Sequence, residues 1–186
     1  MHNPILRNVA MADLDLLREV SIQTFMAAFA HMNTPENMSF YLDQAFNNDQ
    51  LSKELDNAES QLYFLEQGGD ILGYLKINFG EAQTESVYPE AVEIQRIYLY
   101  PKAQGLGLGK YLIEVAEQIG VEQGCPLVWL GVWDKNEKSI GFYEKMGYTI
   151  FDSHDFPFGD DLQTDHLMKK NIFWFFWIFW CIFIIK

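Results

Sequence analysis

Three glycines alternate with other residues in a short segment, residues 104–110 (QGLGLGK), between a predicted strand and a predicted helix. Residues 92–100 alternate between apolar and polar side chains, which predicts a strand, and residues 108–123 have the apolar spacing of a helix. Glycine adopts positive φ angles and lets the backbone approach a ligand closely. The N–H groups of such a loop and of the next helix N-terminus bind anions. The segment therefore predicts a pyrophosphate site, to which Lys110 adds charge.

The spacing of these glycines argues against two other phosphate-binding loops. A Walker loop requires Ser or Thr after its lysine, and Lys110 is followed by Tyr111. A Rossmann turn follows the first strand of a parallel sheet and needs a third glycine at position 110, which is lysine here. A tight turn without a ligand is the structural alternative.

The remaining apolar patterns predict strands and helices without an internal linker or repeat. A Gly-Gly-Asp turn at residues 68–70 predicts a hairpin between two of the strands. Strands are expected at 5–9, 61–65, 71–79, 92–100, 127–132, 148–151 and 166–168, and helices at 13–29, 40–46, 50–57, 108–123 and 137–146.

Composition limits the functional classes. The 186 residues suit one domain, and a net charge of −13 disfavours nucleic acid, whose binding depends on Lys and Arg. Cys125 and Cys181 lack the spacing of a zinc site or a disulfide framework, so no metal is expected. The N-terminus lacks the apolar region of a secretory signal, and we expect a cytoplasmic location.

The C-terminal stretch, residues 172–185, differs in kind from the rest of the chain. It carries no charge and consists almost entirely of Phe, Trp and Ile. It is shorter than the ~20 residues that a membrane-spanning helix needs. We therefore expect a domain at residues 1–171 and a tail at residues 172–186 that is foreign to it. A membrane or partner contact and a packed native strand are the alternatives for the tail.

Two motifs resemble the GNAT family of N-acetyltransferases. Gln104-x-x-Gly107-x-Gly109 resembles that family's [RQ]xxGx[GA] loop, and residues 136–148 (NEKSIGFYEKMGY) resemble its Nxx[AS]xxFYxxxGF segment. The resemblance implies acetyl-CoA as the cofactor and an α/β fold, with a mixed, mostly antiparallel sheet of about seven strands and helices on both faces. The residues implied in cofactor binding are Ile97, Tyr98, Leu99, Gln104, Gly105, Leu106, Gly107, Leu108, Gly109, Lys110, Asn136, Ser139 and Lys145.

Over nearly all of residues 5–171 the chain also resembles the PaiA-type polyamine acetyltransferases, for example at residues 35–38, 44–47, 129–133 and 159–165. This resemblance implies an acceptor such as spermidine or spermine, and a homodimer. Gln104 stands where many GNAT proteins carry Arg, so phosphate binding depends more on backbone N–H groups. Membrane binding is not expected of the domain.

The resemblance implies that Tyr143 is the general acid that protonates the leaving thiolate, since a phenol with a pKa near ~10 stays protonated at neutral pH. The attacking amine must lose a proton, and Glu93, on the strand expected to pass the thioester, is the candidate general base. His154 and His166 are alternatives with suitable pKa values. A backbone N–H near Ile97–Tyr98 would stabilise the oxyanion. Cys125 gives no reason to expect an acyl-cysteine, so attack is direct.

A polycationic acceptor requires carboxylates and apolar surfaces at its binding site. Candidate carboxylates are Asp152, Asp155, Asp160, Asp161 and Asp165 between the last strands, with Glu36 and Asp43 opposite, and candidate aromatic residues are Phe25, Phe29, Tyr41 and Phe156. Two other hypotheses stay open: acetylation of an aminoglycoside, an amino acid or a protein N-terminus, and a CoA-binding sensor without turnover. The presence of Tyr143 argues against the sensor, which needs no general acid.

Overall fold

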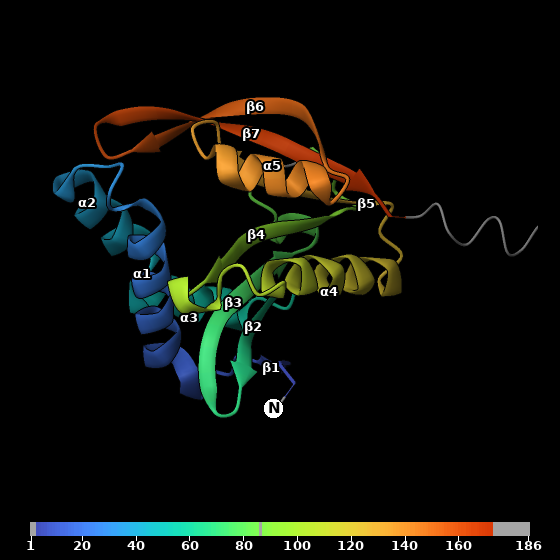
Figure 1. The fold of residues 1–186 in the computed structure, drawn as a ribbon, viewed down its shortest axis with the longest axis horizontal. Coiled ribbons are helices and arrows are strands. Elements are labelled where there is room, and N and C mark those ends of the chain that lie inside the picture. Colours follow the sequence, from blue (N-terminus) through green and yellow to red (C-terminus); the bar gives the residue numbers. More distant parts are fainter. Residues whose placement is uncertain (1–2, 86, 173–186) are drawn as a thin grey trace, which may run out of the picture.

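A computed structural model describes residues 3–85 and 87–172 as a seven-stranded sheet with five α-helices. The sheet order is β1–β2–β3–β4–β5–β7–β6 (Figure 1). Within these residues five strand pairs are antiparallel and one, β4–β5, is parallel, which confirms the predicted mixed sheet. The strands are β1 (Ile5–Asn8), β2 (Ser60–Gln67), β3 (Asp70–Asn78), β4 (Val92–Leu99), β5 (Leu127–Trp133), β6 (Thr149–Phe158) and β7 (Asp161–Asn171).

The helices begin where the sequence supplies caps. The Thr34 hydroxyl accepts from Asn37 N at 3.2 Å at the start of α2, and Pro35 occupies its first position. The Asn47 side chain accepts from Gln50 N at 2.8 Å at the start of α3. The helices are α1 (Leu14–Phe29), α2 (Pro35–Ala45), α3 (Asn48–Asp56), α4 (Leu108–Glu122) and α5 (Glu137–Lys145).

Side chains alternate across the strands, so the sheet has an apolar core on each face. On one face Leu65 and Leu75 pack with Leu112 of α4 and Tyr143 of α5. On the other face Phe64 and its neighbours on β2 and β3 pack with α1, α2 and α3. The predicted arrangement of helices on both faces is confirmed.

The central feature of the sheet is the divergence of β4 from β5. These strands pair only at Val92↔Val128 and Glu93↔Trp129, near their starts. β4 continues along β3 as far as Leu99, and β5 continues along β7 as far as Trp133. Among the described residues no further pair joins β4 to β5, so the facing edge of β4 keeps unpaired backbone groups for a ligand.

The last two strands are longer than predicted. The sequence predicted strands at 148–151 and 166–168 with an acidic loop between them, but β6 and β7 form a hairpin that turns at Gly159 and Asp160. Its acidic residues, Asp152 and Asp155 on β6 and Asp161 and Asp165 on β7, occupy paired positions and so do not interrupt the hairpin. This corrects the predicted bounds of the last two strands. The helix predicted from residue 40 also starts earlier, at Pro35, directly after the Thr34 cap.

The predicted tail falls almost entirely outside the described residues. Its first residue, Ile172, donates its N–H to Pro126 O at 3.0 Å and packs against the core of α4. In the described part of the chain, no helix combines the length and the apolar character needed to cross a membrane.

Candidate active site

A cavity of about 1090 Å³ occupies the space between the diverging strands β4 and β5. α1, α5, the glycine segment and the β6–β7 hairpin contribute to its walls. The cavity brings together most of the predicted site residues: Glu93, Ile97, Tyr98, Leu99, Gln104, Gly105, Gly107, Gly109, Lys110, Asn136, Ser139 and Tyr143. Three others are not among its lining residues: Leu106 is exposed, the side chain of Leu108 lies in the core, and Lys145 is exposed.

The glycine segment is shaped to receive a ligand. Gly105 and Gly107 have φ angles of 75° and 79°, which only glycine adopts without strain, and Gly107 caps α4. A Cβ added at either position would meet no atom of the described residues within 4 Å, so the space that they leave beside the backbone is open. The open loop and the N-terminus of a 15-residue helix form an anion site that fits the pyrophosphate of CoA.

Cations and amides adjoin this anion site. Lys110 lines the cavity, and Lys138 Nζ donates to Gln104 Oε1 at 3.1 Å. The Gln104 position therefore has a positive charge beside it, although Gln104 itself is neutral. Asn136 caps α5 by accepting from Ser139 N at 3.2 Å, and its second amide atom, a donor, remains for a ligand.

Tyr143 lies on α5 at the cavity wall and is 8% exposed. Burial raises the pKa of its phenol above the usual value. The hydroxyl therefore carries its proton throughout the neutral range, as a general acid must.

Glu93 is 2% exposed and lines the cavity near the point where β4 and β5 part. Its Oε2 accepts from Asn78 Nδ2 and from Thr84 N, each at 2.9 Å, and its Oε1 accepts from the Thr84 hydroxyl. Burial raises the pKa of the carboxyl, against these hydrogen bonds and the charge of Lys76. A carboxylate with a raised pKa is a stronger base than an exposed one.

The other candidate acid–base groups lie less favourably. His154 lines the cavity, with Nδ1 2.9 Å from Glu85 Oε1, whereas His166 is not among the lining residues. Cys125 is buried in the core and does not line the cavity. Within the described residues, no group of three or more His, Cys, Asp or Glu is arranged to hold a metal ion.

The end of the cavity away from the glycine segment is acidic and aromatic. Of the predicted carboxylates, Asp155 and Asp165 line it, whereas Asp152, Asp160, Asp161, Glu36 and Asp43 do not. Burial raises the pKa of Asp165. The four predicted aromatic residues all contribute, and Phe25 stacks on Tyr41 with centroids 4.6 Å apart. Acidic groups beside aromatic rings suit an acceptor with several ammonium groups joined by methylenes.

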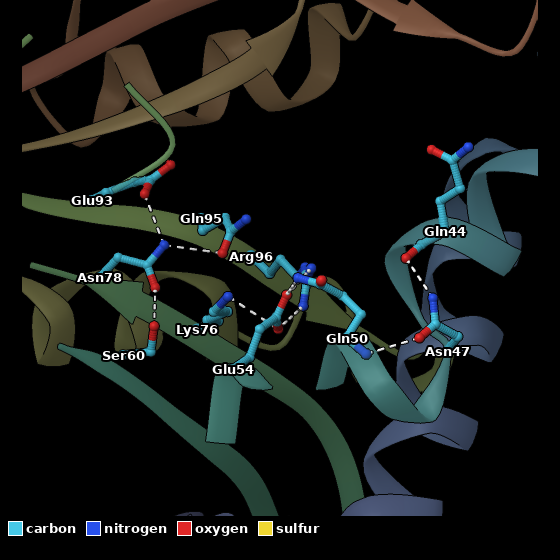
Figure 2. Close-up of polar contacts among 10 residues, drawn as sticks. All are labelled: Gln44, Asn47, Gln50, Glu54, Ser60, Lys76, Asn78, Glu93, Gln95 and Arg96. Carbon is cyan, nitrogen blue, oxygen red and sulfur yellow. Dashed lines mark hydrogen bonds and ion pairs between the residues drawn. The ribbon is translucent and has the colours of Figure 1, made fainter. Parts of the chain in front are cut away.

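Sequence analysis missed a buried charge cluster behind this wall (Figure 2). Glu54 of α3 accepts from Arg96 Nη1 and Nη2 at 2.6 and 2.9 Å, and Lys76 Nζ lies 3.0 Å from Glu54 Oε2. Arg96 also lines the cavity. A signal was available, because Lys76 and Asn78 interrupt an otherwise apolar predicted strand, and buried polar groups require partners.

Residues 24–148 match the model of the Acetyltransferase (GNAT) family. The chain is 43% identical to an uncharacterized N-acetyltransferase in the pepI 3′ region of Lactobacillus delbrueckii subsp. lactis, over 87% of this chain and 94% of the relative. It is 23% identical to the spermidine N(1)-acetyltransferase of Thermoplasma acidophilum, over 89% and 95%. The structure of the Thermoplasma acidophilum PaiA N-acetyltransferase in complex with coenzyme A has a TM-score of 0.73 at 21% identity, covering 91% and 99% of the two chains. This chain therefore belongs to the GNAT family and is an acetyl-CoA-dependent N-acetyltransferase.

Proposed function

We propose that this enzyme acetylates a primary amine of a polyamine, spermidine or spermine. The observation that carries the proposal is the acidic acceptor end, where Glu85, Asp155 and Asp165 line the cavity in addition to Glu93. A polyamine carries several protonated nitrogens, each of which can pair with one of these carboxylates. Its methylene groups can pack against the aromatic rings. The similarity to a spermidine N(1)-acetyltransferase supports the same acceptor class.

In the proposed mechanism, Glu93 removes a proton from the acceptor. An alkyl ammonium has a pKa near ~10, so the amine must be deprotonated before it attacks. Glu93 accepts that proton, directly or through one water. Acetyl-CoA supplies an activated thioester when it is bound. Backbone N–H groups of β4 near Ile97 and Tyr98 would stabilise the negative charge that develops on the carbonyl oxygen, and Tyr143 would give its proton to the leaving sulfur. The second proton lost by the attacking nitrogen would return to the Tyr143 phenolate through water.

The cofactor is proposed to lie along the open edge of β4. Ile97, Tyr98 and Leu99 offer backbone groups to the pantetheine arm, and the glycine segment holds the pyrophosphate. Asn136 has a free amide donor on the opposite wall, beside Ser139. Leu106, Leu108 and Lys145 contribute at most through backbone or peripheral contacts.

Free-thiol release from acetyl-CoA tests the proposal. The full chain is offered spermidine, spermine, an aminoglycoside and a short peptide in parallel. We expect the highest kcat/KM with the polyamines and a rate at least tenfold lower with Tyr143→Phe, which keeps the ring and removes the acidic proton. Turnover with the aminoglycoside or the peptide alone would contradict the proposal that the acceptor is a polyamine. Tight CoA binding without turnover of any amine favours a sensor.

A further inference from the structure

Four charged side chains are buried together behind the acceptor end of the cavity. Glu93, Lys76, Glu54 and Arg96 are 2%, 3%, 6% and 7% exposed. Glu54 holds both cations: it receives two hydrogen bonds from Arg96 and pairs with Lys76 at 3.0 Å. One carboxylate therefore faces two positive charges. Glu93, when ionised, brings the sum of the four charges to zero.

A β-bulge brings these groups onto one face of the sheet. Lys76 pairs with Arg96 and Asn78 pairs with Glu93, so β4 has one residue more than β3 across the same span. In a regular strand, residues three apart point to opposite faces. The extra residue on β4 compensates for this, so Glu93 and Arg96 share the face that Lys76 and Asn78 occupy on β3.

Asn78 holds Glu93 from the neighbouring strand β3 through its side-chain amide (Figure 2). Its Oδ1 accepts from Ser60 Oγ at 2.9 Å, which leaves Nδ2 as the group that faces Glu93. Nδ2 donates to Glu93 Oε2 at 2.9 Å and to Gln95 Oε1 at 3.0 Å. Asn78 is 0% exposed, so water does not compete for these bonds. The amide presents a donor to Glu93, and a donor stabilises the ionised carboxylate.

We propose that Lys76 and Asn78 are positioning residues that keep Glu93 ionised and oriented toward the acceptor amine. The inference rests on the proposed role of Glu93 as general base. Burial by itself favours a protonated carboxyl, which cannot accept a proton. The hydrogen bonds from Thr84 and Asn78 oppose that effect on the pKa of Glu93, and the charge of Lys76 adds to them. Once Glu93 has taken the proton, the buried cluster carries a net positive charge, which favours release of the proton to solvent.

Other charged groups face Glu93 or the same cavity from neighbouring elements. They are Glu54 of α3, Arg96 of β4, Glu85 before β4, His154 and Asp155 of β6, Asp165 of β7 and, elsewhere in the cavity lining, His31, Lys110, Lys135, Glu137 and Lys138. Lys76 is the group best suited to substitution, because it is not among the cavity-lining residues and makes a single ion pair. When Lys76 is removed, Glu54 still accepts from Arg96 and from Gln50.

The test is the pH profile of kcat/KM for the full chain, with acetyl-CoA saturating and the fastest amine of the acceptor screen varied. Lys76→Met is expected to move the acidic limb upward by about two pH units, the order of effect of one charge several ångströms away at an effective dielectric of about 20. Lys76→Arg keeps the charge and is expected to keep the wild-type limb. A purely structural role would lower the whole profile without moving the limb.

Asn78→Leu tests the hydrogen bond, because it keeps the approximate shape of the side chain, removes the donor and adds no charge beside Glu93. Its acidic limb is also expected to move upward. A carbon-detected NMR titration of the Glu93 carboxyl measures the same shift without turnover, and serves if a variant folds but is inactive. An unshifted limb and an unshifted carboxyl titration in a folded variant overturn the assignment for that residue.

Glu93→Gln separates this inference from the proposed function. If it loses activity while Lys76→Met and Asn78→Leu titrate like wild type, the positioning inference fails and Glu93 remains the base. If Glu93→Gln keeps both the rate and the acidic limb, the proposed base itself is wrong.

Discussion

The two ends of the cavity are built in different ways. The cofactor end is formed by backbone groups of one continuous segment, residues 104–110, with solvent-exposed cations such as Lys138 beside it. The acceptor end is formed by side chains from α1, α2, β4, β5, β6 and β7, and Glu93 and Arg96, two of its charged residues, are buried. Backbone groups suffice to hold a phosphate, whereas selecting and deprotonating an amine requires charges held in a dry environment.

The largest effect is expected from Glu93→Gln. This substitution removes the proposed base and keeps the size of the side chain, so kcat is expected to fall by about 10²–10⁴-fold. The affinity for acetyl-CoA, measured by calorimetry, is expected to stay within about twofold of the wild-type value, because the two ends bind their ligands independently.

The matched control is Glu85→Gln, which neutralises a half-exposed carboxylate of the same cavity. It is expected to raise the KM for the amine and to leave kcat unchanged. An equal loss of kcat in both variants would contradict the special role of Glu93.

Next in size is the loss of stability in Glu54→Leu. Removing this carboxylate leaves Lys76 and Arg96 buried without their partner, and breaking a buried ion pair in this way costs about 3–5 kcal/mol. Urea unfolding followed by circular dichroism measures the change. Lys76→Met leaves Glu54 paired with Arg96 and is expected to be neutral or stabilising.

The control for this stability comparison is Glu114→Leu. Its ion pair with Lys110 spans 3.5 Å on the exposed surface of α4, and such pairs contribute less than about 0.5 kcal/mol. If Glu54→Leu and Glu114→Leu destabilise the chain equally, the cluster behind the acceptor end is not the buried network described above.

The contrast between a site built from one continuous segment and a site built from several elements explains how much of the molecule could be predicted from the sequence. The element order, the sheet and the glycine segment follow from local patterns, because each lies within one run of sequence. Glu54, Lys76 and Arg96 come from three elements, and only folding brings them together. The β6–β7 hairpin was predicted too short, because its exposed acidic residues resemble a loop. A lysine and an asparagine inside an apolar strand were the available sign of the buried network.

A smaller effect, confined to the cofactor end, is expected from Gly107→Ala. The φ angle of 79° at the cap of α4 costs an alanine roughly 1–2 kcal/mol, which the loop relieves by leaving its binding conformation. The Kd for acetyl-CoA is therefore expected to rise about tenfold, while the KM for the amine at saturating acetyl-CoA stays the same. Gly141→Ala is the control: it lies within α5, has no neighbour within 4 Å of an added Cβ, and favours the helix. A weaker acetyl-CoA affinity in both variants would mean that the effect does not come from the glycine loop.

The smallest effect is expected from Lys138→Met, which tests whether charge contributes to the cofactor end at all. Lys138 donates to Gln104 beside the proposed pyrophosphate site, and both side chains are exposed. At low ionic strength the Kd for acetyl-CoA is expected to rise about two- to fourfold, and the difference from wild type is expected to vanish near 0.5 M salt, where screening acts within a few ångströms. Lys102→Met removes an exposed lysine that is not among the cavity-lining residues and is expected to change nothing. A salt-independent loss would instead mean that Lys138 acts by ordering Gln104. Gln104→Arg distinguishes these explanations, because it places a second cation beside Lys138. Repulsion between the two cations would make the gain in acetyl-CoA affinity smaller than one added charge alone would provide.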